Sequence, residues 1–282
     1  MSLHRFACFC AFAAFFLLIA GAMVTSTGSG LAVPDWPLSY GQYFPPMKGG
    51  VFFEHGHRVM AFCVALMTGL LAFWVWSSES RRWVRALAWA AALGILLQAF
   101  LGGLTVLYGL PKAVSIAHAC LGQAVFCLLV AIAQATMPRP ADAALPGSSV
   151  FSGKPWIAGA AAIGLLYVQL ILGAALRHTG EGLLLHLFGA FAASAAVAWT
   201  AHEAYSSFAQ EPSLRRPAAL LLILLPVQFL LGLAALTVRT HRVAALSWPV
   251  ALTAAHLACG AALLGLAVLW TLRAVSLLPR GV

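Results

Sequence analysis

The sequence predicts an all-α polytopic membrane protein whose eight transmembrane helices form two tandem four-helix bundles. Composition is the first observation: 62% of the 282 residues are hydrophobic and 8% are charged, whereas soluble domains carry about 45–50% apolar and about 25% charged residues. The second is the mean hydropathy of +0.95. The third is that the apolar residues fall in runs of about 20, which is the length that crosses a hydrocarbon core. Together they exclude a water-soluble enzyme, a disulfide scaffold and a nucleic-acid-binding protein.

The apolar runs are separated by polar or helix-breaking residues, and each is long enough for one membrane crossing. They cover residues 6–24, 55–76, 84–107, 113–136, 156–176, 182–202, 217–238 and 248–274. The first run follows a short basic start like that of a signal peptide, but it is long and no small-residue cleavage site follows, so we interpret it as a helix. An even number of spans puts both termini on one side of the membrane.

Positive charge sets the expected orientation. The larger share of the 16 Lys and Arg residues falls on the side of the two termini, and cytoplasmic loops carry such an excess. This predicts cytoplasmic N- and C-termini in a bacterial cytoplasmic membrane. It also accounts for the net charge of +9 without a nucleic-acid partner.

A polar stretch at 137–155 divides the chain near its middle, so we expect an N-terminal bundle over 1–136, a cytoplasmic linker, and a C-terminal bundle over 156–282. The two halves share the motif Q-x-x-L-G, which suggests internal duplication. It occurs at Gln98–Gly102, Gln169–Gly173 and Gln228–Gly232, always in spans that run outward. Because glycine lets a backbone or a flat ligand approach a membrane helix closely, the motif fits either helix packing or a ligand site.

Four histidines lie near the start of the second, fourth, sixth and eighth spans, namely His57, His118, His186 and His256. These spans all begin on the outer side, so the four side chains lie at similar depth in the outer part of the membrane. A single histidine there would usually be a packing residue. Ionisable residues inside a membrane are costly and usually functional, and four at one depth indicate a site. The residue four positions after each is small, namely Ala61, Gly122, Ala190 and Gly260.

The chemistry of paired imidazoles narrows the choice of site. A closed zinc site would need further Cys, Asp or Glu ligands, and the only acid nearby is Glu54. Proton relays and haem ligation remain. Haem iron takes axial imidazoles from facing helices, which predicts one site between the second and fourth spans and one between the sixth and eighth. Arginines on the same side either bind haem propionates or anchor the interface, and for propionates we favour Arg58 and Arg239.

The run Glu54-His55-Gly56-His57-Arg58 carries the strongest local signal. Glu54 and His57 are three residues apart and so share a helix face. The carboxylate could orient a haem, transfer protons or position a substrate, or it could be an acid favoured by the helix dipole. His186 has no such acid immediately before it, which suggests one working site and one accessory site. We expect neither His55 nor His178 to bind a metal.

With these residues assembled, the chain resembles the heme A synthase family over essentially its whole length. The resemblance rests on the segment TGSGLAVPDWPLSYGQ at 27–42, the run EHGHR at 54–58 and the single histidines of the later even spans. It implies oxidation of the C8 methyl group of haem O to the formyl group of haem A, by way of a hydroxylated intermediate, for terminal oxidases.

The resemblance also assigns the two halves of the chain. It implies a haem O substrate site at His57 and His118 with Glu54 as a catalytic or positioning acid, and a haem b cofactor between His186 and His256. It further implies an electron donor and a haem O synthase as partners in the bilayer.

One feature departs from the resemblance. Some bacterial members carry a cysteine pair in the first outer loop, whereas residues 25–53 hold no cysteine. All six cysteines lie within spans, so we expect no disulfide.

Two other functions would use the same histidines: a di-haem cytochrome b that carries electrons, and a non-catalytic haem chaperone. A transporter is less favoured because no span has a mid-membrane break. The oligomeric state does not follow from the sequence.

Overall fold

The computed structural model describes residues 1–138, 156–240 and 247–277. This part of the chain contains eight helices, all long and apolar enough to cross a membrane, so the predicted fold class is confirmed. The helices are α1 (Leu3–Ser26), α2 (Gly50–Ser78), α3 (Arg82–Leu107), α4 (Lys112–Ala135), α5 (Trp156–Thr179), α6 (Leu183–Ser206), α7 (Pro212–Thr240) and α8 (Ser247–Leu277). Most of the expected linker at 137–155 lies outside the described residues.

Several helices are longer than their apolar runs. α2 begins at Gly50 rather than near residue 55, and α7 begins at Pro212 rather than at residue 217. The apolar run marks only the part inside hydrocarbon, and the helix continues into the polar boundary because its backbone hydrogen bonds persist there. Proline suits the first turn of a helix, where its missing N–H is not needed. As a result, His57 lies about two turns inside α2 rather than at its start.

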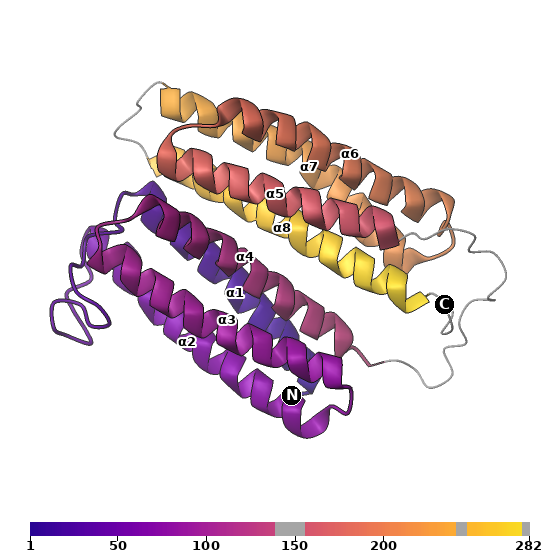
Figure 1. The fold of residues 1–282 in the computed structure, drawn as a ribbon, viewed down its shortest axis with the longest axis horizontal. Helices are drawn as coiled ribbons and strands as arrows, with labels where there is room; N and C mark the ends of the chain where they lie inside the picture. Colours follow the sequence, from indigo (N-terminus) through magenta and orange to yellow (C-terminus); the bar gives the residue numbers. More distant parts are fainter. Residues whose placement is uncertain (139–155, 241–246, 278–282) are drawn as a thin grey trace.

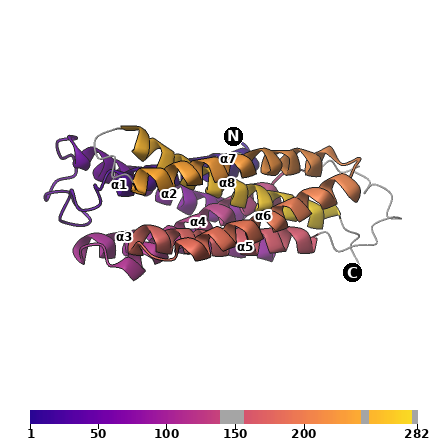
Figure 2. The same cartoon turned by 90° about the horizontal axis from the view of Figure 1, so that it is seen from above.

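The helices form two rings of four. In the first ring α1 and α3 each contact both α2 and α4, and in the second ring α5 and α7 each contact both α6 and α8. In each ring the two helices that carry the histidines therefore lie diagonally across the interior. The rings join where α8 contacts α1 and α4 and where α4 contacts α5. Figure 1 shows the rings side by side, and in Figure 2 they overlap in the view from above.

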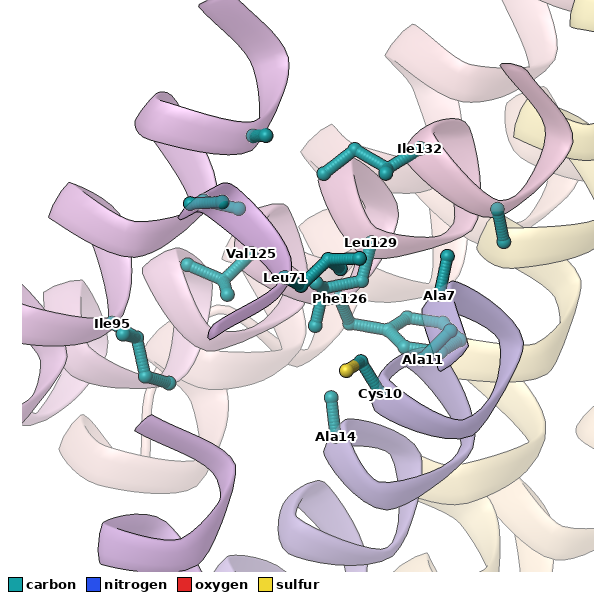
Figure 3. Close-up of a cluster of buried hydrophobic side chains, with 14 of the residues drawn as sticks. Ala7, Cys10, Ala11, Ala14, Leu71, Ile95, Val125, Phe126, Leu129 and Ile132 are labelled. Atoms are coloured by element: carbon teal, nitrogen blue, oxygen red, sulfur yellow. The ribbon is translucent and has the colours of Figure 1, made fainter. Parts of the chain in front are cut away.

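The interior of the first ring is packed with small side chains facing large ones (Figure 3). Among the labelled residues, those of α1 are small, and those of α2, α3 and α4 are branched or aromatic. The labelled members are Ala7, Cys10, Ala11, Ala14, Leu71, Ile95, Val125, Phe126, Leu129 and Ile132. Small residues let membrane helices approach closely and gain van der Waals contact, which drives association where lipid is as apolar as the protein. Ala261 of α8 belongs to the same cluster, so the two rings pack as one body.

The connections differ at the end of the molecule opposite the N-terminus. Residues 27–49 form a long loop between α1 and α2, at the left of Figure 1. Residues 180–182 make a tight turn between α5 and α6, in which Gly180 and Gly182 both have φ of 89°, a conformation that glycine adopts at little cost. Among the connections that the structure describes at this end, the loop of residues 27–49 in the first ring is the longest.

Candidate functional site

Each of the four intramembrane histidines packs against a glycine on the preceding helix. The glycines lie near the end of the outgoing helix of each hairpin, so the contacts occur at matching depth. A Cβ atom built on the glycine would lie close to the Cε1 atom of the imidazole in every case: 3.1 Å for Gly21 and His57, 3.4 Å for Gly102 and His118, 3.0 Å for Gly173 and His186, and 3.0 Å for Gly232 and His256. At Gly21, Gly173 and Gly232 an added Cβ atom would be tighter than ordinary contact, so the imidazole would have to shift, whereas at Gly102 it would lie at the limit of ordinary contact. Glycine therefore allows each imidazole to lie against the preceding helix.

His186 and His256 face each other across the second ring of helices. Their ring centres are 6.4 Å apart, and the planes meet at 74°. Because a metal–imidazole bond is about 2.0–2.1 Å long, two imidazoles on opposite sides of one metal ion have ring centres roughly 6 Å apart. The observed separation therefore fits two axial ligands of a single iron.

His57 and His118 are also brought together, since they lie close enough to repel each other when both are protonated. The Nδ1 atoms of His57, His118 and His256 are buried, and the described residues offer them no hydrogen-bond partner. Buried polar atoms without partners are few in proteins and call for an explanation. Imidazole nitrogens are the usual axial ligands of haem iron, so this donor set fits haem. Among residues 1–138, 156–240 and 247–277, no three His, Cys, Asp or Glu side chains gather as a protein-only metal site would require.

The glutamine of the Q-x-x-L-G motif contacts the same histidines. The side-chain amide of Gln98 donates to the carbonyl oxygen of His118 at 3.0 Å. Gln169 donates to the carbonyl oxygen of His186 at 2.8 Å and lies 3.0 Å from its Nδ1. The amide of Gln228 lies 3.5 Å from Nε2 of His256. The glutamine and the glycine of the motif thus both contact the histidines, a role that the sequence left undecided.

Gly21 is the contact that sequence reasoning missed. α1 has no glutamine four residues before its glycine, so the Q-x-x-L-G motif does not include Gly21. The signal that could have found it is the glycine alone, placed near the end of an outgoing span.

Glu54 is buried, with 3% of its surface exposed, and both of its carboxylate oxygens are bound. One oxygen forms an ion pair with Arg58 at 2.6 Å, and the other accepts a hydrogen bond from the backbone N–H of Val33 at 2.8 Å. The sequence placed Glu54 beside His57, but it could not decide between partners three and four residues away. The carboxylate fastens the loop between α1 and α2 to the start of α2.

Two more residues of the EHGHR run hold this loop. Arg58 donates to the carbonyl oxygens of Asp35 at 2.7 Å and Leu38 at 2.8 Å. His55 is 8% exposed and its Nδ1 lies 2.8 Å from the hydroxyl of Ser39. Propionate binding by Arg58 stays a prediction. In the structure the two terminal nitrogens of its guanidinium donate to Glu54 and to the carbonyl oxygens of Val33, Asp35 and Leu38.

The loop also reaches the helix beside His118. A Cβ atom built on Gly103 would lie 2.8 Å from the indole of Trp36, and Gly103 follows the glycine that contacts His118. The tip of the loop is closed by Asp35, whose carboxylate accepts from the N–H groups of Tyr40 at 2.6 Å and Gly41 at 2.7 Å. The hydrogen bonds from Gly41 and Tyr40 hold the pKa of Asp35 below its usual value. Residues 27–49 are thus fastened to α2 and α3 beside the residues that carry or contact the first histidine pair.

Arg177 of α5 lies at the junction of the two rings. Its guanidinium donates to the hydroxyl of Ser26 at 2.7 Å, and that hydroxyl is 2.8 Å from the hydroxyl of Thr253 on α8. It is also within electrostatic range of His256. In the described part of the chain, no carboxylate lies within ion-pair distance of it; the pairs found there are Arg58–Glu54 and Arg81–Glu79. Arg177 is therefore a half-buried cation without an acidic partner beside a predicted iron ligand.

The structure describes fewer contacts for the remaining predicted residues. His178 lies within electrostatic range of His118. Arg239 belongs to α7, but its side chain lies outside the described residues, as does Arg242. All six cysteines are free.

Comparison with known proteins gives matches over much of the chain. The sequence model of the COX15-CtaA family, described as cytochrome oxidase assembly protein, matches residues 4–50 and 47–188. A protein named heme A synthase from Alkalihalophilus pseudofirmus is 35% identical over 105 residues, covering 36% of this chain and 35% of that protein. Proteins of the same name from Bacillus licheniformis and Bacillus pumilus are each 30% identical, covering 60% and 61% of this chain and 56% and 57% of their own lengths. The matched stretches thus span from about a third to just over half of these relatives.

Proposed function

The chain belongs to the COX15-CtaA family of cytochrome oxidase assembly proteins, and we propose that it is a heme A synthase. In this proposal the protein oxidises the C8 methyl group of haem O to the formyl group of haem A, through a hydroxylated intermediate, for terminal oxidase biogenesis. The relatives named heme A synthase support this reaction. The structural observation that carries it is the pair His186 and His256, whose ring centres lie 6.4 Å apart. In the other ring, His57 and His118 lie within electrostatic range of each other.

The two pairs take different roles in the proposal. His57 and His118 hold the substrate haem O, and His186 and His256 hold a haem b cofactor. Haem b, when bound, supplies one-electron transfer from a donor protein or quinol. The protein supplies the axial imidazoles, fixes their depth through the glycine contacts and covers the first pair with residues 27–49.

Glu54 is the residue proposed to act as catalytic or positioning acid at the substrate site. It lies on the turn before His57, and its carboxylate is held by Arg58 and by the N–H of Val33. A buried carboxylate held this way has a fixed position relative to the bound substrate. Positioned side chains that transfer protons contribute about 10²–10⁴-fold to a rate, so a role in proton transfer would make Glu54 indispensable.

The charged groups of the cofactor need cationic partners. Haem b carries two propionates, and arginine binds carboxylates by charge-assisted hydrogen bonds. We propose Arg177 as one partner, because it lacks an acidic neighbour in the described residues and lies in range of His256. Arg58 and Arg239 remain the partners predicted from the sequence.

The protein is an integral membrane protein with eight helices long enough to span the bilayer in its described part. The proposal places it in a bacterial cytoplasmic membrane, with cytoplasmic termini and with the haem sites toward the outer side. A haem O synthase and an electron donor are the proposed partners.

The test is to express the chain together with a haem O source, purify it, and identify the extracted haems by chromatography and mass. Haem A, or the singly hydroxylated haem, beside haem B would support the synthase. Haem B and unmodified haem O alone, from protein with an intact bis-imidazole spectrum and a working reductant, would favour a di-haem cytochrome b or a haem chaperone.

A further inference from the structure

The four hairpins hold their histidines by two different means. In the hairpins α3–α4, α5–α6 and α7–α8, a glutamine one turn before the histidine-contacting glycine reaches the histidine on the returning helix. In α1–α2 the equivalent position is Leu17, which cannot donate a hydrogen bond. His57 therefore has no contact of this kind, which we call the glutamine tie: a side-chain amide on the outgoing helix that contacts the histidine of the returning helix.

Each of these glutamines packs on a glycine of the histidine helix. A Cβ atom built on Gly122 would lie 2.6 Å from the amide of Gln98, and one built on Gly260 would lie 3.3 Å from that of Gln228. A Cβ atom built on Gly189 would collide with the amide of Gln169. Glutamine and glycine are thus a matched pair, and they occur together in three hairpins.

The first hairpin replaces both members of this pair. Ala61 stands four residues after His57, where Gly122 and Gly260 stand in their own helices. In α6 the position four residues after the histidine is Ala190, and Gln169 packs instead on Gly189, three residues after His186. α2 has Met60 and Ala61 at these two positions and so offers no glycine, and Leu17 supplies no amide. The two replacements agree with each other, so the first hairpin is built without the tie.

In the first hairpin, contacts with the loop of residues 27–49 replace the contact with a glutamine. Residues on both sides of His57 are fastened to residues 27–49: Glu54 to the N–H of Val33, His55 to Ser39, and Arg58 to the carbonyl oxygens of Asp35 and Leu38. This segment is fixed by contacts with a connecting loop, whereas the other three histidines are fixed by contacts within the helix bundle.

We propose that Gln98, Gln169 and Gln228 are positioning residues that fix the axial histidines of their hairpins, whereas His57 is positioned by the loop of residues 27–49 and is the ligand that releases. The proposal rests on the proposed function, in which one haem stays and the other enters and leaves. A substrate site needs one ligand that can give way, and a connecting loop yields more readily than a packed helix pair.

The first experiment compares two buried glutamines. Gln169→Leu removes the amide that holds His186, and Gln123→Leu removes a buried glutamine of α4 that has no bond to a histidine. The readouts are the absorbance spectrum of the purified protein, the haem B content per chain and the rate at which haem B passes to added apomyoglobin. Because residues that orient a metal-binding histidine typically contribute 10–100-fold to metal affinity, we expect Gln169→Leu to lose haem B about 10–100-fold faster. Gln123→Leu should match the wild type.

Folding is checked separately, because a membrane protein can lose its cofactor by unfolding. Both variants should elute from size exclusion as monodisperse protein and unfold at a similar temperature without haem. If Gln169→Leu proves unstable, Gln228→Leu takes its place. A folded glutamine variant that keeps haem B with wild-type spectrum and transfer rate overturns the positioning role.

The second experiment transfers the tie into the first hairpin. The double variant Leu17→Gln with Ala61→Gly supplies both members of the pair, and we expect haem O to leave the first site more slowly. Ser39→Ala, which frees His55, should make haem O leave faster while the transfer of haem B is unchanged. Equal haem O transfer rates in the wild type and both variants overturn the role given to the loop.

These readouts separate the two proposals. Failure of the wild type to make haem A would refute the proposed function, but it would leave the haem-transfer rates of the glutamine variants to decide the inference. Wild-type haem A production together with unchanged transfer rates in every variant would refute the inference alone.

Discussion

Each ring of helices carries two histidines, one on each of its even-numbered helices, but the connections between the helices differ at the end where the histidines lie. The first ring carries residues 27–49, which are fastened to α2 by Glu54, His55 and Arg58 and which touch α3 through Trp36. In the second ring, residues 180–182 make the corresponding α5–α6 connection in a tight turn. The second ring has a glutamine contact at both of its histidines, through Gln169 and Gln228, whereas the first ring has one only at His118, through Gln98.

This difference shows how one helical plan can serve two purposes. Contacts within a helix bundle suit a group that stays, because they break only when the helices separate. Contacts with a loop suit a group that comes and goes, because loops open at lower free energy than packed helices. The experiments below test whether the two rings differ in this way, beginning with the largest expected effect.

Replacing a histidine of the second ring should have the largest effect. His256→Met or His186→Met removes an axial imidazole, so the spectrum of bound haem b should shift or disappear. His57→Met is the matched variant in the first ring and should leave that spectrum intact. The measurement is the reduced-minus-oxidised absorbance spectrum of purified protein. Equal spectral loss in all three variants would mean that haem b is not held by the second ring alone.

Replacing Glu54 should stop product formation without touching the second ring. Glu54→Ala is expected to lower the rate of haem A formation by about 10²–10⁴-fold, the usual contribution of a proton-transferring side chain, with the haem b spectrum unchanged. Glu54→Gln separates two roles, because the amide oxygen can still accept from the N–H of Val33. Restored product in the glutamine variant would assign Glu54 to holding the loop, and wild-type product from Glu54→Ala would remove it from both roles.

Crowding the loop against α3 should have a moderate effect confined to the first ring. Gly103→Ala places a methyl group 2.8 Å from the indole of Trp36, and overpacking of this kind costs about 1–3 kcal/mol. We expect faster proteolysis of residues 27–49 and less haem A. Gly69→Ala is the control, since a Cβ atom there meets nothing within 4 Å. Identical proteolysis of the two variants would show that Trp36 does not hold the loop.

Acid should loosen the loop only slightly and only at low pH. The N–H groups of Gly41 and Tyr40 lower the pKa of Asp35 from its usual value of 3.8. A lowered folded-state pKa means that the carboxylate stabilises the turn above pH 3.8 and that this contribution is lost as the pH falls through the folded-state pKa. Amide hydrogen exchange at residues 40 and 41, corrected for the intrinsic pH dependence, should therefore stay protected down to about pH 4 and rise below it. Asp35→Asn should remove this pH dependence.

The eight helices could be predicted because a membrane crossing needs a minimum length of apolar chain, and that length is visible in the sequence. Their ends could not, since helices such as α2 and α7 continue into the polar boundary, where hydropathy gives no signal. The pairing of histidines was also predictable. Helices that start on the same side place residues near their starts at the same depth, whatever the details of packing.

The contacts of Glu54 show where sequence reasoning ends. Residues three and four positions ahead share its helix face, so His57 and Arg58 were equally good partners by spacing. The choice depended on residues 27–49, which supply an N–H to the carboxylate and carbonyl oxygens to Arg58. Loop contacts of this kind carry no periodic pattern, and the role of Ser39 and Trp36 was invisible for the same reason.

The hairpin arrangement has a consequence for the way the chain meets its surroundings. A hairpin returns the chain to the side from which it came, so each added hairpin brings its histidine into the membrane from the same side as the last. Because every returning helix starts at the same end of the molecule, all four histidines lie toward that end, however many hairpins are joined. Reactants that approach through the aqueous phase on that side have the shortest route to both histidine pairs, and a single soluble or surface-bound protein there could serve the whole molecule.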